Sequence, residues 1–358
     1  MKKLALVLVF AASALVPASA PAAGCSPLDC APTSSALGHG LFAVRPQGLN
    51  GTVVVDRLDN GQTKWMLPQG VLTGHTLVHQ DGAKLTWYDA LTGAQTGTAN
   101  IHGRNGFVVG TSQDGRSAVL LYTYRGSTTL QIVTPSSQRN VALKGTDWGF
   151  DALADSSLYL LRYEKNGYQV RRYDLARRRL VAQPLKDPHE SSLIWGTAWS
   201  RVTSPDGRYV FTLYLGPDGG AMVHELDVRH STARCIDLPG SGNFNLGTTY
   251  TMKLSGKTVW AVNPGYGRVV GIDVASAKVR VAFRFRAAPS ISESPAAPVS
   301  DISGSRIAVA VGGDAWLVNT RTQSVRRLGN HPATAIAFAR GGTRLWIVQG
   351  TKLNALRL

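Results

Sequence analysis

A unit of strand, polar turn and strand recurs along the chain, and no other feature limits its fold as strongly. Each copy contains an apolar run that ends in Asp, Asn or Thr, and these anchor residues lie 33 to 53 residues apart. The anchors are Asp56, Asp89, Thr134, Asp174, Asp227, Asp273, Asn319 and Asn354. A repeat of this length is typical of one antiparallel sheet of about four strands. The sequence therefore predicts a series of similar sheets.

A second hairpin precedes most copies of the unit. In VTSPDGRYVFTLY, at residues 202–214, Asp206-Gly207 supplies a tight turn and an apolar strand follows it. No segment combines an apolar period of 3.6 residues with capping residues, so we expect very little helix.

Two of these motifs resemble a known fold family. SPDGRYVFTLY (204–214) and GIDVASAKVRVAF (271–283) look like the blades of bacterial YVTN-type, TolB-like and WD-repeat-like β-propellers. The resemblance implies an all-β propeller over residues 41–358, in a ring closed by the N- and C-terminal strands. We expect seven four-stranded blades, with the two terminal fragments sharing one sheet; the alternative is eight, if each fragment forms its own sheet. The motif indicates fold rather than function, because propellers bind, scaffold and catalyse.

The terminal fragments are expected to be incomplete. The first (LFAV, TVVVD, KWML) lacks a recognisable innermost strand, and the last (ATAIAF, LWIV, KLNALRL) lacks an outermost one.

The first residues predict export. Two lysines precede an apolar run at residues 4–16, and small residues follow it, which is typical of a signal peptide over residues 1–23. The apolar run is shorter than the roughly 20 residues of a membrane-spanning helix. Residues 24–40 are expected to form a linker that contains cysteine. We predict a secreted or surface-attached protein without a transmembrane segment.

Three cysteines allow several arrangements. Cys25 can pair with Cys30, or Cys30 with Cys235. Cys25 also follows small residues, as a lipid-anchored cysteine does, but the usual Leu three positions before it is missing. Disulfide pairing and a lipid anchor at Cys25 both stay open. The cysteines form no metal-ligand set, and we predict neither a metal nor a cofactor.

The chain is strongly basic. Cleavage after residue 23 removes two lysines and no acid, which lowers the formal net charge from +16 to +14. Such a charge favours an anionic cell-envelope polymer as partner, beside a protein partner. Nucleic acid is disfavoured by the export signal and because the arginine clusters fall in separate hairpins.

Familiar catalytic motifs are missing from the sequence. His75 and His79 lie four apart in a predicted strand, too far from each other to hold one metal. Ser255-Gly256-Lys257-Thr258 resembles part of a phosphate-binding loop, but its context is strand-turn-strand. We therefore predict no catalytic residue.

Three long connections between blades are the strongest candidates for a binding surface. They span residues 187–200, 239–249 and 287–298, and neighbouring blades would place them on one rim. The candidate ligand-binding residues there are His189, Glu190, Trp195, Trp199, Phe244 and Glu293, with Trp148 of the preceding GTDWGF nearby. The alternative is that the tryptophans pack between blades and the acids are solvated.

Two functions follow from these observations. The first is a non-enzymatic propeller that binds a protein or an envelope polymer through the long loops. The alternative is an enzyme, such as a lactone hydrolase or a quinone- or metal-dependent dehydrogenase, with its site at the central channel. Three or more His, Asp or Glu side chains at the axis would favour the enzyme. A structural role in a TolB-like assembly ranks last.

Overall fold

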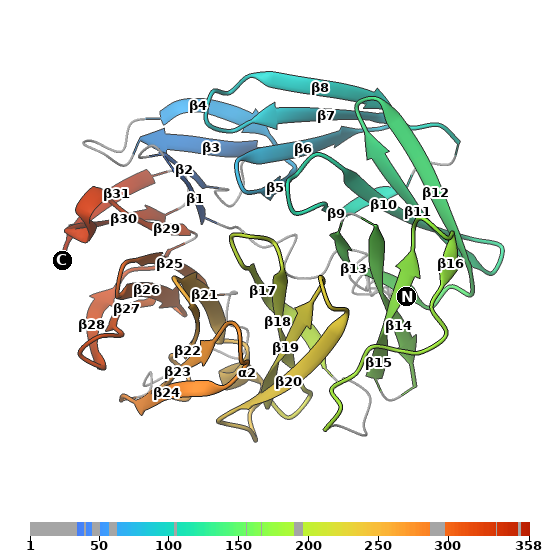
Figure 1. The fold of residues 1–358 in the computed structure, drawn as a ribbon. Coiled ribbons are helices and arrows are strands. Elements are labelled where there is room, and N and C mark those ends of the chain that lie inside the picture. The colour runs from blue at the N-terminus through green and yellow to red at the C-terminus, as the bar shows by residue number, and fades with distance from the viewer. Residues whose placement is uncertain are drawn as a thin grey trace, which may run out of the picture.

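The structure is a computed structural model, and it consists of antiparallel sheets arranged around a common axis (Figure 1). Seven sheets have four strands and an eighth has three. It describes residues 34–38, 41–44, 51–56, 63–103, 106–154, 156–165, 167–189, 196–286, 298–333, 335–349 and 352–358.

The first four sheets follow one another along the chain. The first contains β1 (Ser34–Gly38), β2 (Leu41–Val44), β3 (Gly51–Asp56) and β4 (Thr63–Pro68). The second contains β5 (Val71–Thr73), β6 (Thr76–Asp81), β7 (Lys84–Asp89) and β8 (Gln95–Asn100). The third contains β9 (Phe107–Thr111), β10 (Ala118–Tyr124), β11 (Ser127–Thr134) and β12 (Ser137–Lys144). The fourth contains β13 (Trp148–Ala154), β14 (Ser157–Glu164), β15 (Gly167–Asp174) and β16 (Arg179–Leu180).

The other four sheets complete the series. The fifth contains β17 (Thr197–Thr203), β18 (Tyr209–Leu215), β19 (Ala221–Asp227) and β20 (Thr232–Leu238). The sixth contains β21 (Thr251–Ser255), β22 (Thr258–Asn263), β23 (Arg268–Asp273) and β24 (Val279–Arg284). The seventh contains β25 (Val299–Ser303), β26 (Arg306–Val311), β27 (Asp314–Asn319) and β28 (Ser324–Asn330). The last contains β29 (Ala335–Phe338), β30 (Arg344–Gln349) and β31 (Lys352–Arg357).

The predicted all-β propeller is confirmed. Within each sheet the strands lie in chain order, and the first strands of neighbouring sheets face one another around the axis. The ring closes where β1 lies against β29. Seven four-stranded sheets agree with the predicted seven blades, but the two terminal units form separate sheets, and the last has three strands among the described residues.

One boundary expected from the sequence differs in the structure. Residues 34–38, which we expected in the linker, form β1 and complete the first sheet. Their sequence, SSALG, has a single large apolar residue, Leu37, among small ones, and so lacks the apolar run that marks a strand. Backbone pairing with β2 therefore defines this strand better than its side chains do.

Helix is scarce, as predicted. The described residues contain the one-turn α2 (Phe244–Gly247) and the short 3₁₀ helix η1 (Arg340–Gly342). Across the described part of the chain, the helices are too short to cross a membrane.

The meander of strands creates two distinct ends of the propeller. The end that carries the turns between first and second strands, and between third and fourth strands, is called here the turn face. The opposite end carries the turns between second and third strands and the connections from sheet to sheet, and is called the loop face. The described residues of the long connections at 187–200 and 239–249 lie where one sheet ends and the next begins, at the loop face.

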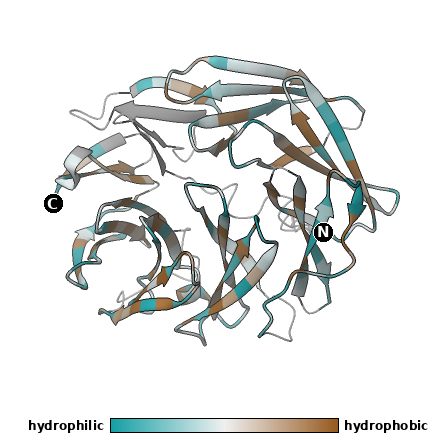
Figure 2. Ribbon diagram, in the orientation of Figure 1, coloured by the Kyte–Doolittle hydropathy of each residue, from teal (hydrophilic) through white to brown (hydrophobic). Residues whose placement is uncertain are grey.

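The core consists of apolar layers between neighbouring sheets. Every residue of the two middle strands β18 and β19 is buried, whereas the outer strand β24 is largely exposed. Hydrophobic colour accordingly concentrates on the strands and hydrophilic colour on the turns (Figure 2). One cluster joins Phe211 of the fifth sheet to Tyr250 and Ile272 of the sixth. Such strands need cover on both faces, which the ring of sheets supplies.

The repeated anchor residue closes the turn after the third strand. The Asp227 Oδ1 atom accepts hydrogen bonds from the backbone N–H groups of Arg229 and His230, at 3.0 and 3.1 Å. Asn319 accepts the equivalent bonds from Arg321 and Thr322. Asp and Asn are favoured in turns because their side chains can cap nearby N–H groups. The need for such an acceptor in each of these turns explains why the anchor residues recur along the sequence.

The same turns place a residue in the left-handed backbone region. Four residues after its anchor, the chain has a positive φ in five sheets. These positions are Gly93, Arg178, Ser231, Ala277 and Gln323, with φ of 74°, 54°, 53°, 53° and 52°. The conformation costs a residue with a Cβ roughly 1 kcal/mol, and glycine avoids that cost.

We expect Gln323→Gly to raise the free energy of unfolding by about 1 kcal/mol, because it relieves this backbone cost at an exposed site. Gln323→Ala keeps the Cβ and is the matched control, with an expected change below about 0.5 kcal/mol. Urea unfolding measures both variants. An equal effect of glycine and alanine would contradict the backbone explanation.

Candidate functional site

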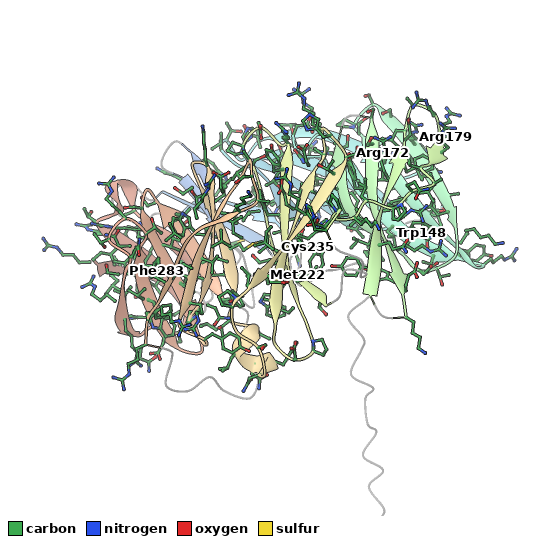
Figure 3. All side chains as sticks on the ribbon, turned by 60° about the horizontal axis from the view of Figure 1, so that its bottom comes forward. Trp148, Arg172, Arg179, Met222, Cys235 and Phe283 are labelled. Atoms are coloured by element: carbon green, nitrogen blue, oxygen red, sulfur yellow. The ribbon has the colours of Figure 1, made fainter. Side chains whose placement is uncertain are left out.

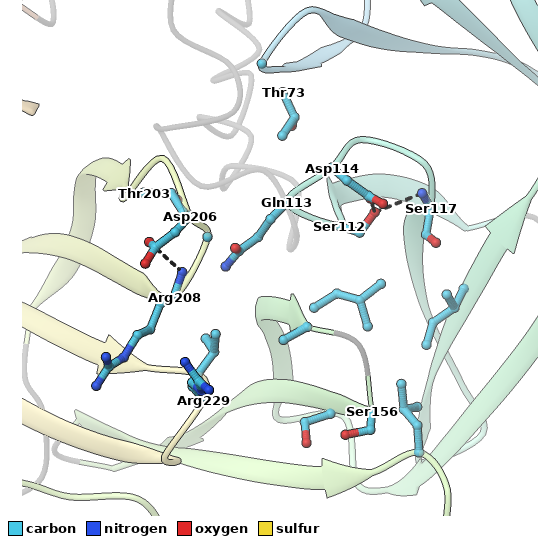
Figure 4. Close-up of a pocket in the computed structure, with 18 of the residues that line it drawn as sticks. Thr73, Ser112, Gln113, Asp114, Ser117, Ser156, Thr203, Asp206, Arg208 and Arg229 are labelled. Atoms are coloured by element: carbon cyan, nitrogen blue, oxygen red, sulfur yellow. Dashed lines mark hydrogen bonds between the residues drawn. The ribbon is translucent and has the colours of Figure 1, made fainter.

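A cavity of about 1190 Å³ opens at the turn face, between the second, third, fourth and fifth sheets (Figure 4). Its lining comes from the first turn of each of these sheets and from three of their turns between third and fourth strands. The cavity therefore lies at the opposite end of the propeller from the predicted rim of long loops.

Two turns with the same sequence pattern border the cavity. Residues 112–116 read SQDGR in the third sheet, and residues 204–208 read SPDGR in the fifth. In the first, the Ser112 hydroxyl donates to Asp114 Oδ1 at 2.6 Å, and the backbone N–H of Arg116 donates to the same oxygen at 3.0 Å. The second turn repeats both bonds, at 2.5 and 3.2 Å.

The aspartates of these turns serve as structural acceptors. The hydrogen bond from the Ser204 hydroxyl, together with that from the backbone N–H of Arg208, lowers the pKa of Asp206 below its ordinary value. Asp206 therefore stays ionised at neutral pH and holds its own turn together.

The two turns meet across the cavity although their sheets are not neighbours. Gly207 has a φ of 71°, and a Cβ at this position would collide with Oε1 of Gln113 from the other turn. Glycine is thus required by its backbone conformation and by the approach of Gln113. Nε2 of Gln113 is buried and has no hydrogen-bond partner among the described residues. The side-chain amide of Gln113 therefore offers a hydrogen-bond donor at the contact between the two turns.

The cavity wall is rich in hydroxyl groups and contains three guanidinium groups. The hydroxyl side chains belong to Thr73, Ser112, Ser117, Ser137, Ser156, Ser157, Thr203 and Ser204. The guanidinium groups belong to Arg139, Arg208 and Arg229. Small aliphatic side chains such as Ile132 and Leu153 lie between them, and no aromatic ring is among the described lining residues. This lining suits a ligand that has both hydroxyl and anionic groups.

The three arginines differ in whether their guanidinium groups already donate hydrogen bonds within the protein. Arg208 donates to Asp227 Oδ2 at 2.8 Å, and Arg139 donates to the carbonyl oxygen of Leu175. Arg229 is exposed, and its guanidinium donates to no acceptor among the described residues. Arg229 therefore carries the charge that is most available to a ligand.

Two of the predicted site residues pack inside the protein. Trp148 is 5% exposed, its Nε1 atom donates to the carbonyl oxygen of Lys144 at 2.9 Å, and the Arg162 guanidinium lies 5.3 Å from the centre of its ring. Trp199 is partly buried and donates to the carbonyl oxygen of Thr248 at 2.9 Å. Figure 3 shows Trp148 well away from Arg179, which lies on the turn face.

Two other predicted residues are exposed on the loop face. Phe244 begins α2 and is 44% exposed, and His189 is exposed beside Asp187. Glu190, Trp195 and Glu293 lie outside the described residues. The described residues do not bring the candidates together into one cluster, and the proposed rim remains a prediction.

The loop at 239–249 is held by a hydrogen-bond network. The Asn263 side chain donates to the carbonyl oxygen of Leu246 at 3.0 Å and accepts from the Thr249 hydroxyl at 2.8 Å. The Tyr266 hydroxyl donates to the carbonyl oxygen of Asn243 at 2.7 Å. Phe244 is thus an exposed apolar residue on a well-tied loop.

Sequence reasoning missed the cavity because it followed loop length. The signal that could have found it is the second copy of the SxDGR pattern, at residues 112–116. These two short turns are 92 positions apart in the numbering and meet across a third sheet. Their meeting is a property of the ring, and no local sequence pattern encodes it.

A buried polar cluster joins the fourth and fifth sheets near the axis. Arg201 donates to Asp151 Oδ1 at 2.7 Å and to the Thr212 hydroxyl at 3.1 Å. Burial lowers the pKa of His224 and raises that of Tyr214, so both side chains are neutral at pH 7. Within the described ranges, no three His, Cys, Asp or Glu side chains gather as a metal site.

The cysteine alternatives fall largely outside the described residues. Cys25 and Cys30 are not among them, and Cys235 lies on β20, where its backbone N–H donates to Asp187 Oδ2 at 2.7 Å. The disulfide pairing and the lipid anchor stay open.

Asp227, which accepts hydrogen bonds from the cavity residue Arg208, affects the stability of the fold at low pH. Burial alone would raise its pKa, but hydrogen bonds from Arg208 and His230 hold the pKa at about 2. Because this pKa is lower in the folded than in the unfolded chain, the stabilisation is present above about pH 4 and is lost as the pH falls toward 2.

We expect Asp227→Asn to lower the free energy of unfolding at pH 7 by about 2 kcal/mol and to flatten its dependence on pH below about pH 4. Urea unfolding at several pH values measures both effects. Asp81→Asn, which removes an exposed carboxylate at the loop face, is the control. An unchanged acid dependence in Asp227→Asn would show that other carboxylates dominate.

Comparisons with known proteins support the fold. No family model matches the chain, and no curated protein is similar to it in sequence. Among solved structures, the Dos1 propeller aligns at 12% identity with a TM-score of 0.50, over 88% of each chain. Citrobacter koseri AztD aligns at 13% identity with a TM-score of 0.49, over 82% of this chain and 85% of the other. Identities this low inform on fold alone, and the chain is a β-propeller.

Proposed function

We propose that the protein is an exported, non-enzymatic propeller that binds its ligand in the turn-face cavity. The observation that carries the proposal is the convergence of turns from four sheets on one cavity lined by hydroxyl and guanidinium groups. The turns SQDGR and SPDGR are each closed by their own hydrogen bonds, which makes this part of the surface rigid. A preorganised wall lowers the entropic cost of binding.

The titratable groups of the cavity favour binding over catalysis. A general acid or base works best with a pKa near the operating pH. The pKa values of Asp114 and Asp206 are instead shifted down, and both carboxylates are used within their turns. The arginines can bind anions but do not exchange protons at neutral pH.

The loop face is the second candidate location. Phe244 is exposed there on a well-tied loop, as a recognition residue would be. Export to the cell surface or the medium, and kinship with YVTN-type or TolB-like propellers, belong to the same proposal and rest on the sequence alone.

Blocking the cavity tests the proposal. Ser156 is an exposed lining residue, and Ser156→Trp should fill the opening without disturbing the core. We expect the wild type to be stabilised in thermal unfolding by members of a panel of envelope polymers and their fragments. Ser156→Trp should lose at least about tenfold in affinity for these ligands, since the indole would exclude them.

Two control variants decide between the faces. Ser156→Ala should bind like the wild type, and so should Phe244→Ala. Loss of binding in Phe244→Ala with full binding in Ser156→Trp would contradict the proposal and move the site to the loop face. Conversion of a ligand into product by the purified protein would favour the enzyme alternative.

A further inference from the structure

Exposed arginines continue the charge of the cavity across the turn face. Arg178 lies on the turn between β15 and β16, Arg179 begins β16, and Arg229 lies on the turn between β19 and β20. All three are exposed, and none of their guanidinium groups donates to an acceptor among the described residues. These three residues are called here the arginine fringe. Figure 3 shows Arg179 at the edge of the turn face.

The fringe is distinct from arginines that the structure uses internally. Arg177 on the same turn is paired with Asp174 at 3.2 Å, and Arg172 donates to the Ser231 hydroxyl at 2.8 Å. Asp174 also caps its turn through the backbone N–H of Arg177, at 2.8 Å. The nearby acids are therefore occupied, and the fringe keeps its positive charge for a partner.

The fringe and the cavity belong to one surface. Arg229 lines the cavity, and the turn that carries Arg178 and Arg179 begins next to Leu175, another lining residue. Arg139 lines the cavity as well and donates to the carbonyl oxygen of Leu175. Positive charge thus extends from the cavity wall to the rim of the fourth sheet. A small ligand would fill the cavity, whereas a longer one would also reach the fringe.

We propose that the cavity and the arginine fringe together bind a polyanion with phosphate or carboxylate groups on a hydroxylated backbone. This inference rests on the proposed function. Guanidinium groups match phosphate and carboxylate oxygens, which accounts for the anionic part. Hydroxyl groups alternating with small aliphatic side chains, such as Ser157 and Leu153, match a polyol backbone with its O–H and C–H groups.

The lining argues against nucleic acid as the polyanion. Proteins that hold single strands stack the bases on aromatic side chains. None of the described lining residues is aromatic. A polymer without bases makes fuller use of this surface.

The test uses polyglycerol phosphate as the probe, with binding to the whole mature protein measured by calorimetry. The fringe variant combines Arg178→Gln, Arg179→Gln and Arg229→Gln. Its matched control combines Lys165→Gln, Arg284→Gln and Arg286→Gln, three exposed cations of the loop face. Both variants lose the same formal charge, so net charge alone cannot distinguish them.

We expect the fringe variant to bind polyglycerol phosphate about tenfold more weakly and with a shallower salt dependence. The loop-face control should keep at least about half of the wild-type affinity. Equal weakening in both variants would show non-specific attraction and overturn the inference. So would unchanged binding in the fringe variant, or a wild type that binds neither polyglycerol phosphate nor polygalacturonate.

Further probes separate this inference from the proposed function. Polygalacturonate presents carboxylates on a hydroxylated backbone and distinguishes the two anion types. Oligo(dT) binding as tight as that of polyglycerol phosphate, and lost in the fringe variant, would overturn the exclusion of nucleic acid. Uncharged dextran that binds the wild type but not Ser156→Trp would support the cavity as a ligand site and contradict a polyanion.

Discussion

In each sheet, wherever the turn after the third strand is described, the anchor side chain accepts hydrogen bonds that close this turn. The turn face depends on these hydrogen bonds. Asp227 caps the N–H groups of Arg229 and His230, and its neighbour Val228 donates its own N–H to the carbonyl oxygen of Arg208 at 2.9 Å. The third strand is thereby tied to the first turn of the same sheet. Leu175 donates to Ser156 in the same way at 2.9 Å. These ties fix the turns that line the cavity.

This arrangement explains why the turn face can carry a binding site. The turns are short, capped and anchored to strands that are buried on both sides, so polar side chains project from fixed positions. Gly207 allows Gln113 to approach from a non-neighbouring sheet and brings two similar turns to one cavity. The cations that remain exposed there, Arg178, Arg179 and Arg229, face solvent while the nearby acids are engaged.

The sequence predicted the fold far better than the site. The anchors and the hairpin turns are local patterns, because a capped turn needs an acceptor such as Asp273 at a fixed place. The sequence therefore predicts each blade separately. Strand β1 was not predicted because its sequence, SSALG, has only one large apolar residue, and its pairing with β2 is not visible in the sequence. The cavity was not predicted from the sequence, because it depends on which turns meet around the ring. Trp148 was a candidate ligand-binding residue, and its buried indole agrees with the alternative that the tryptophans pack between blades.

Hydrogen exchange of the protein, with and without polyglycerol phosphate, tests the central claim that ligands bind at the turn face. The account predicts slower exchange in the turns at residues 112–117, 175–179, 204–208 and 228–231, which border the cavity or carry the fringe. Residues 239–249 on the loop face should exchange as in the free protein. Protection confined to residues 239–249 would contradict the account and place the binding surface on the loop face.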